Sequence, residues 1–145
     1  MRILIAVLVV ALGACSPPAA SSAPAPAAAA PPPPAQGVSF QSPSGNIGCN
    51  YTPAGGTEVY STADGRAELQ CDRIEPTYVR ITLPETAAAH LTQTDERGCC
   101  GGETIAYGDR WTEGPFICDS TEAGLTCSSS AGHGFTLSRT RQDVH

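Results

Sequence analysis

Apolar and polar residues alternate over several short stretches of the chain, and the clearest is TYVRITL at residues 77–83. There Val79, Ile81 and Leu83 are aliphatic while the residues between them are polar or amphipathic. A period of two residues is typical of a β-strand that is buried on one face only. This stretch therefore predicts a half-buried strand.

Further short extended stretches lie on both sides of this one. The same pattern predicts strands in VSF, IGCNY, TEVYST, RAELQC, TIAY, RWT, FICD, LTCS and GFTLS, at residues 38–40, 47–51, 57–62, 66–71, 104–107, 110–112, 116–119, 125–128 and 134–138. Turn signals at 64–65, 108–109 and 120–124 predict hairpins, and 134–138 is expected as the last strand. The only helical candidate is ETAAAHL at 85–91. We expect an all-β fold: a small disulfide-stabilised β-sandwich or barrel of about seven short strands.

The first fifteen residues indicate export and lipidation. Met1-Arg2 precedes an apolar run from Ile3 to Leu12, too short to span a bilayer but suited to a secretory signal. The run closes with LGAC, which resembles the bacterial lipobox. By that rule Cys15 becomes the new N-terminus and carries two or three acyl chains, palmitate among them, enough for stable anchoring. The expected location is the cell membrane, on the outer side of the cytoplasmic membrane.

A linker follows the lipidation site. Residues 16–37 are almost entirely Ala, Pro and Ser, with four consecutive prolines at Pro31–Pro34. Such a segment has no apolar period with which to build a core and favours an extended, disordered chain. The expected organisation is therefore a signal peptide at 1–14, lipidated Cys15 and linker at 15–37, a β domain at 38–140 and a tail at 141–145.

The cysteine count agrees with this location. The chain has seven cysteines, and lipidation of Cys15 leaves six: Cys49, Cys71, Cys99, Cys100, Cys118 and Cys127. In a small exported domain six cysteines predict three disulfides. Cys118 and Cys127 lie on the two arms of one predicted hairpin and are expected to pair. Two solutions remain for the other four. Cys49 pairs with Cys71 and the neighbours Cys99 and Cys100 pair with each other, or the doublet is tied to Cys49 and Cys71 in either order. Strain in a bond between neighbours favours the second.

Longer motifs carry a family resemblance. FQSPSGNIGC, LQCD, CGGETIAYGDRW and GPFICDSTEAGLTCSSSAGHGFTLSR together resemble an uncharacterised secreted and lipoprotein domain family of actinobacteria, with the pattern SPSGNIxC … YGxxW … GLTCxxxxGHGFxLSR. The resemblance covers residues 40–139 and implies a small disulfide-stabilised β domain of unknown activity. This chain departs from the family in placing Cys99 directly before Cys100, which leaves the pairing of the first four domain cysteines open.

The charge excludes one class of partner. The chain has 8 arginines, no lysine and 14 acidic residues, for a formal net charge of −6. A negative surface repels phosphate backbones and anionic headgroups, so nucleic acid is not expected as a partner.

Candidate chemistry in the folded part is sparse. The isolated positions of His90, His133 and His145 predict no metal site, and no cofactor is expected. Ser44 and Asn46 lie in a turn-forming SPSGN string, which predicts side-chain bonds to the backbone rather than a nucleophile. Glu103 and Asp109 flank a strand near aromatic residues, which could serve glycan hydrolysis or binding. We take no residue as catalytic. The candidate binding residues are Tyr107, Trp111 and His133.

Three functional hypotheses remain. The favoured one is a lipid-anchored, non-enzymatic binding or structural module whose ligand is an envelope protein or glycan, marked by an exposed aromatic patch at Tyr60, Tyr107 and Trp111. A small envelope hydrolase would need a pocket that joins His133 to Glu103, Asp109 or Ser44. A thiol–disulfide redox lipoprotein would use Cys99 and Cys100, although no CxxC motif is present.

Overall fold

The computed structural model describes residues 35–98 and 100–145. Within these residues the fold is all-β, with no helix. The strands are β1 (Val38–Gln41), β2 (Ile47–Thr52), β3 (Glu68–Arg73), β4 (Val79–Pro84), β5 (His90–Thr92), β6 (Glu103–Thr104), β7 (Arg110–Glu113), β8 (Phe116–Thr121), β9 (Gly124–Ser129), β10 (Gly134–Leu137) and β11 (Gln142–Val144). The small disulfide-stabilised β fold predicted from the sequence is confirmed.

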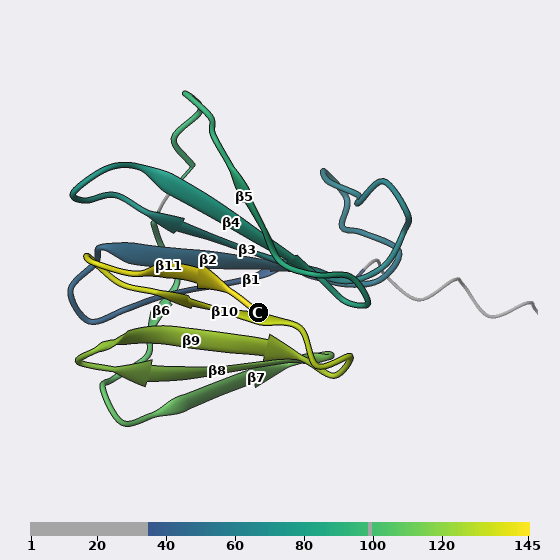
Figure 1. Cartoon of the computed structure of the whole chain (residues 1–145). Coiled ribbons are helices and arrows are strands. Elements are labelled where there is room, and N and C mark those ends of the chain that lie inside the picture. Colours follow the sequence, from purple (N-terminus) through teal and green to yellow (C-terminus); the bar gives the residue numbers. More distant parts are fainter. Residues whose placement is uncertain (1–34, 99) are drawn as a thin grey trace, which may run out of the picture. The chain divides into compact units, whose positions relative to one another are not determined.

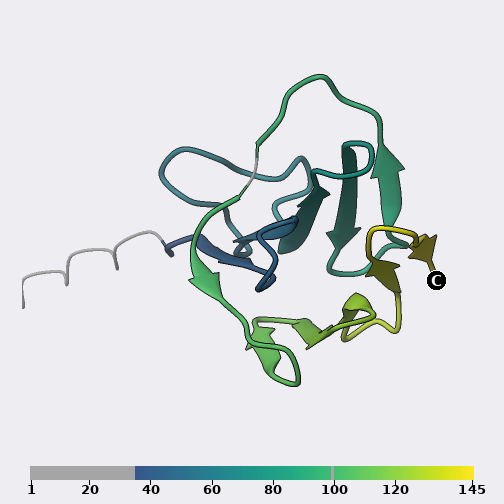
Figure 2. The ribbon, with the colours of Figure 1, turned by 90° about the vertical axis from the view of Figure 1, so that its left-hand side faces the viewer.

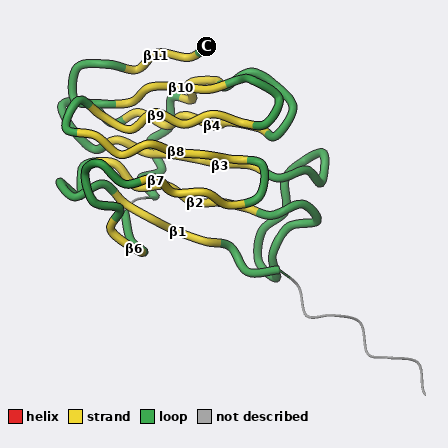
Figure 3. Tube along the Cα trace, turned by 90° about the horizontal axis from the view of Figure 1, so that it is seen from below, coloured by secondary structure: helices red, strands yellow, loops and turns green. Residues whose placement is uncertain are grey.

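The strands form two facing sheets (Figure 1). Sheet A has the order β5-β4-β3-β2-β1-β6 and sheet B the order β11-β10-β9-β8-β7. All neighbours are antiparallel except β1 and β6, which pair in parallel through Phe40–Glu103 and Gln41–Thr104. Seen from below, the strands of both layers run in similar directions (Figure 3), as in an aligned sandwich.

The core lies between the two sheets, because the longer strands of both sheets turn their apolar sides inward. Sheet A contributes aliphatic residues of β3 and β4, of which Leu69, Ile81 and Leu83 are fully buried. Rings from both sheets meet at one side of this core: the centroids of Phe40 and Trp111 are 4.3 Å apart, and Tyr51 packs edge-on against Trp111 and Phe116. The alternation seen in the sequence thus becomes a single shared core.

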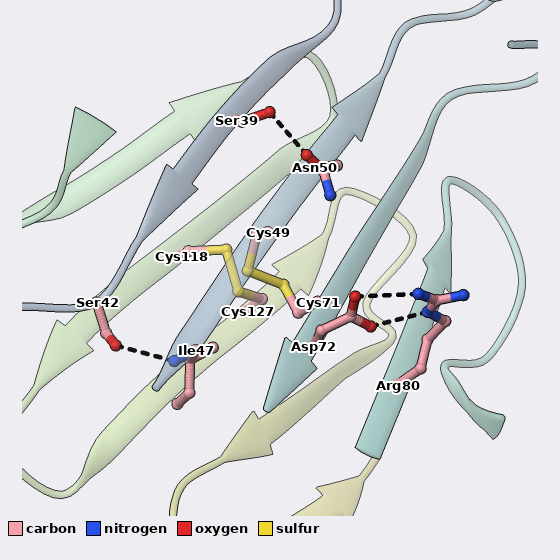
Figure 4. Close-up of a disulfide and its surroundings, with 10 residues drawn as sticks. All are labelled: Ser39, Ser42, Ile47, Cys49, Asn50, Cys71, Asp72, Arg80, Cys118 and Cys127. Carbon is pink, nitrogen blue, oxygen red and sulfur yellow. Dashed lines mark hydrogen bonds and ion pairs between the residues drawn. A yellow bond between two sulfur atoms is a disulfide. The ribbon is translucent and has the colours of Figure 1, made fainter. Parts of the chain in front are cut away.

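One buried disulfide lies within each sheet (Figure 4). Cys118 bonds to Cys127 across the β8–β9 hairpin, which confirms the predicted pair. Cys49 bonds to Cys71, so tying both of them to the Cys99-Cys100 doublet was a wrong expectation. The reason is register: the Cα atoms of Cys49 and Cys71 face each other on β2 and β3, 4.1 Å apart. Cys100 is disulfide-bonded as well, and Cys99 lies outside the described residues.

A long connection crosses the outer face of sheet A (Figure 2). Strands β5 and β6 lie at opposite edges of that sheet, and the described part of the segment that joins them, residues 93–98 and 100–102, is called the strap below. At about 4.8 Å per strand the strap covers roughly 24 Å, within reach of ten extended residues. It covers Asp72, whose carboxylate faces outward from β3 yet is only 1% exposed.

Arg80 on β4 and Tyr78, directly before β4, form hydrogen bonds with the strap. Arg80 donates to the carbonyl oxygen of Glu96 at 3.2 Å, and the amide of Gly98 donates to the Tyr78 hydroxyl at 3.1 Å. The Arg97 guanidinium lies 5.4 Å from the centroid of the Tyr78 ring. Beneath these contacts Arg80 makes a two-pronged ion pair with Asp72, at 2.8 and 3.1 Å. Strap and sheet therefore share one polar cluster.

Three sequence predictions of secondary structure are wrong. Residues 57–62 form a loop, because a turn closed by the Thr57 amide and the Tyr60 carbonyl oxygen interrupts the extended pattern. The predicted turn at 64–65 therefore closes no hairpin between 57–62 and 66–71. Residues 85–91 form no helix; seven residues are too few to sustain one alone, and His90 and Leu91 pair with β4. The segments at 104–107 and 110–112 form no hairpin, because the chain crosses there from sheet A to sheet B.

The strand count was also too low. Eleven strands lie in the described residues, and the last, β11, falls within residues 141–145, which were expected as a tail. Strand β11 pairs with β10 through three residue pairs, from Leu137–Gln142 to Phe135–Val144, so 134–138 is not the last strand. The predictions for the signal peptide, Cys15 and the linker up to residue 34 fall outside the described residues. Among the described residues, no helix is long and apolar enough to cross a membrane.

Candidate binding groove on the outer face of sheet A

A row of polar side chains crosses the outer face of sheet A. The strand registers place Ser39 opposite Asn50, Asn50 opposite Gln70, Gln70 opposite Thr82 and Thr82 opposite His90. These residues alternate with the buried residues of their strands, so their side chains share the outer face. Residues far apart in sequence thus become neighbours.

Part of this row forms the floor of the largest of the three described pockets. The pocket, called the outer groove below, has a volume of about 520 Å³. Its lining residues come from the chain entering β1, from β1, β2 and β3, and from the loop between β2 and β3: Ala35, Gln36, Gly37, Val38, Ser39, Asn50, Tyr51, Thr52, Thr57, Glu58, Val59, Tyr60, Glu68 and Gln70. This volume lies within the usual range for small-molecule sites.

A compact turn forms one wall of the outer groove. The amide of Thr57 donates to the carbonyl oxygen of Tyr60 at 2.7 Å, and the Thr57 hydroxyl oxygen accepts from the amides of Val59 and Tyr60. These bonds fix the loop so that Val59 is 93% exposed and Tyr60 is 51% exposed. Two apolar side chains are therefore presented to solvent by ordered backbone rather than by a free chain end.

Tyr60 and Glu68 are coupled inside the groove. The Tyr60 hydroxyl donates to Glu68 Oε1 at 3.4 Å. Burial raises the pKa of the Glu68 carboxyl above its ordinary value, and the hydrogen bond from Tyr60 opposes that shift without cancelling it. Burial also raises the pKa of the Tyr60 hydroxyl, and the nearby Glu68 charge adds to this shift. At neutral pH Tyr60 is therefore a neutral donor.

The floor offers unused hydrogen-bonding capacity. Ser39 donates to Asn50 Oδ1 at 2.7 Å, which leaves the Asn50 amide nitrogen available (Figure 4). The side-chain amide of Gln70 has no hydrogen-bond partner within residues 35–98 and 100–145. A side-chain amide carries both donors and acceptors, so the floor can satisfy either kind of ligand group.

The three binding residues predicted from the sequence are not brought together. Trp111 is 8% exposed and packs on Phe40, so this aromatic residue belongs to the core. Tyr107 is 45% exposed but lies in another pocket, called the loop-end pocket below, which is lined by loops at the end of the sandwich where β8 turns into β9. His133 lies in the β9–β10 turn, and its carbonyl oxygen accepts from the Ser129 amide. The expected patch of Tyr60, Tyr107 and Trp111 is therefore absent.

The residues considered for hydrolysis are also separated. Ser44 lines the loop-end pocket beside Gly124 and Leu125, at the start of β9, whereas His133 follows the end of β9. Six strand residues separate these ends by about 17 Å. Glu103 and Asp109 are both exposed, and neither lines a described pocket. No acid–base or nucleophilic pair forms from them.

Ser44 and Asn46 have the structural role that the sequence predicted. The Ser44 hydroxyl oxygen accepts from the Asn46 amide, and the buried Asn46 side chain makes two bonds to the backbone of Glu75, at 2.9 and 3.0 Å. Asn46 thus joins the β1–β2 and β3–β4 loops. A neighbouring hydroxyl, that of Ser42, accepts from the Ile47 amide in the same turn (Figure 4).

Part of the groove could be recognised in the sequence. Asn50 and Gln70 stand at the polar positions of IGCNY and RAELQC, where alternation predicts an outward face. Their contact depends on strand register, which the sequence pattern does not provide. No cluster of three or more potential metal ligands occurs among the described residues. No family model, curated protein or solved structure matches the chain.

Proposed function

We propose that the chain is a lipid-anchored protein of the bacterial cell envelope whose β domain is a non-enzymatic binding module. The outer groove is its binding site. The observation that carries this proposal is the groove itself. It is a site of about 520 Å³ with side-chain amides that have unused hydrogen-bonding capacity and a tyrosine ring held at its wall. The resemblance to a secreted actinobacterial domain family is part of the same proposal.

The anchor follows from the lipobox and linker, and two features of the domain support export. Buried disulfides suit an oxidising compartment outside the cytoplasm. The Ala- and Pro-rich segment is followed in the sequence by β1, so it leads into the sheet that carries the groove. A semi-rigid spacer of this composition would hold the domain away from the membrane.

The anchor is tested by expressing the full chain in a bacterial host fed labelled palmitate. We expect label on the protein, partition into detergent, and an N-terminal peptide that begins at an acylated Cys15. The variant Cys15→Ser should lose all three. An unmodified Cys15 in the wild-type protein would overturn the anchor.

The binding module is tested by sedimenting the purified lipoprotein, in detergent micelles, with insoluble cell-wall material and with envelope membranes. We expect retention that falls on substitution of Tyr60→Ala or Gln70→Ala. The matched control is Tyr107→Ala, because Tyr107 is exposed to a similar degree but lies outside the groove lining. Equal retention of the wild-type protein and the three variants would show that the groove is not the binding site.

A further inference from the structure

We propose that the ligand of the outer groove is an uncharged carbohydrate. This inference rests on the proposed function, since it names the ligand class of the same site. Three features of the groove lead to it: its charge, the kind of hydrogen-bonding groups on its floor, and the position of one aromatic ring.

The charge of the groove disfavours anions. Its lining contains two carboxylates, Glu58 and Glu68, and none of the lining residues is lysine, arginine or histidine. An anionic ligand would face these carboxylates with no cation in the lining, because Arg80 and His90, whose charges reach Tyr60 and Glu68, lie outside it. The cost of this repulsion rises as water is displaced. By contrast, arginines line the loop-end pocket: Arg139 and Arg141, paired with Glu75 and Asp143. Acidic ligands such as uronates or phosphates are therefore disfavoured in the outer groove.

The floor is suited to a ligand rich in hydroxyl groups. Gln36, Asn50 and Gln70 bring amides, and Ser39 and Thr52 bring hydroxyls. Each of these groups both donates and accepts, as does a sugar hydroxyl, so neighbouring sugar hydroxyls can be bonded in alternating sense. Glu68 adds an acceptor whose burial strengthens its hydrogen bonds. A polar ligand gains most where floor groups are not already paired, which is the situation of Gln70.

The ring of Tyr60 supplies an apolar surface at the wall. A pyranose carries its C–H bonds on its faces and its hydroxyls at its rim, so it needs an aromatic face beside polar groups. Tyr60 is half exposed, and its hydroxyl is tied to Glu68. With one end of the side chain held, little conformational entropy is lost when a sugar packs against the ring. Val59 extends the apolar wall.

The test measures competition against the groove-dependent retention on wall material. The competitors are oligomers of glucose and of N-acetylglucosamine, both uncharged, an oligogalacturonate as the charged counterpart, and a lysine-containing peptide. We expect the uncharged sugars alone to displace the wild-type protein. Direct titration with the better sugar should show affinity about tenfold lower for Tyr60→Ala. Tyr60→Phe, which keeps the ring, should stay within about threefold.

The outcomes separate the two proposals. If retention depends on the groove but only the peptide competes, or no sugar does, the carbohydrate assignment is wrong and the binding module stands. If oligogalacturonate competes as well as the neutral sugars, the charge selection is wrong. If no retention depends on Tyr60 or Gln70, the proposed function itself fails. Thermal unfolding of each variant, followed by fluorescence of the single tryptophan, checks that loss of binding is not loss of folding.

Discussion

Two arginine–aspartate pairs in this protein have nearly the same geometry but opposite surroundings. Arg80 and Asp72 face each other across β3 and β4, with bonds of 2.8 and 3.1 Å, and Arg110 and Asp119 do so across β7 and β8, at 2.7 and 3.1 Å. The Asp72 side chain is 1% exposed and that of Asp119 is 46% exposed. The molecule therefore contains its own control for the effect of burial on an ion pair.

Replacing Arg80 by Met should destabilise the protein strongly. The change leaves the Asp72 carboxylate buried without its cation, which costs about 3–5 kcal/mol for a buried pair. The equivalent change Arg110→Met should alter the free energy of unfolding little, because solvent screens that pair. Denaturant unfolding followed by Trp111 fluorescence measures both. Equal losses in the two variants would mean that burial by the strap has no energetic consequence.

Glu68 makes stability depend on pH in the direction opposite to most carboxylates. Its pKa is higher in the folded protein than in the unfolded chain, so the folded state binds more protons between the two values. The contribution of this group to stability therefore falls as pH rises through that window, just above the ordinary range for glutamate. Glu68→Gln should remove this slope. Unfolding midpoints of both proteins between about pH 4 and pH 7 measure it, and an unchanged slope contradicts the shift.

Single residues were predicted well where their role is local. The Ser44 hydroxyl oxygen in SPSGN accepts from the Asn46 backbone amide two residues on, as the turn-forming string indicated. Trp111 was misjudged because the three-residue segment RWT has a single apolar position, too little to tell a buried core ring from an exposed binding residue. Gln70 could be placed on an outward face, but not beside Asn50, because that contact depends on pairing two strands with a particular register.

At the scale of elements, local alternation predicted the strands that are long and buried on one face. Strands β2, β4, β8, β9 and β10 all lie where the pattern indicated. The missed strands β5 and β11 have three residues each, too few to show a period, and both pair mainly through their backbone. Residues 57–62 alternate like a strand but have no partner strand, which is a property of the fold and not of the segment.

The strap has one position that only glycine can fill. Gly102 has a φ of +90°, and a Cβ atom there would collide with the backbone carbonyl of Ser39 on β1. Its neighbour Gly101 has open space around its Cβ direction and no positive φ. We expect Gly102→Ala to lower the unfolding midpoint clearly and Gly101→Ala to leave it nearly unchanged. Thermal unfolding compares them, and similar midpoints would contradict the close approach of strap and β1.

At the scale of the whole molecule, the two described disulfides stabilise the fold unequally. Their cysteines are 22 and 9 residues apart, and all four are buried, so replacement by alanine leaves similar cavities. Loop-closure entropy then gives about 3.4 kcal/mol for Cys49–Cys71 and about 2.6 kcal/mol for Cys118–Cys127. The double variants Cys49→Ala/Cys71→Ala and Cys118→Ala/Cys127→Ala should rank in that order in denaturant unfolding. The reverse order would show that strain or residual structure outweighs loop length.

The class of fold was predictable from the whole sequence, but the connection between the two edges of sheet A was not. Short strands and an even number of domain cysteines predicted a small disulfide-stabilised β domain, because both are properties of composition and spacing. The path of the strap across sheet A was not predictable, because it depends on β5 and β6 lying at opposite edges of one sheet. The outer groove shares this origin, since it exists only where three strands and a loop converge.

The parallel pairing of β1 with β6 has a mechanical consequence. β1 is the first strand after the linker and is hydrogen-bonded on both sides, to β2 and to β6. Under the proposed anchoring at Cys15, any drag on the domain enters the fold through β1 and acts along its length. The β1–β2 and β1–β6 hydrogen-bond ladders then resist this force together. Pulling β1 out of the sheet would also require the buried Phe40 ring to leave the core. Under that anchoring the loaded strand is held by two ladders, whereas the last strand, β11, is held by one, to β10.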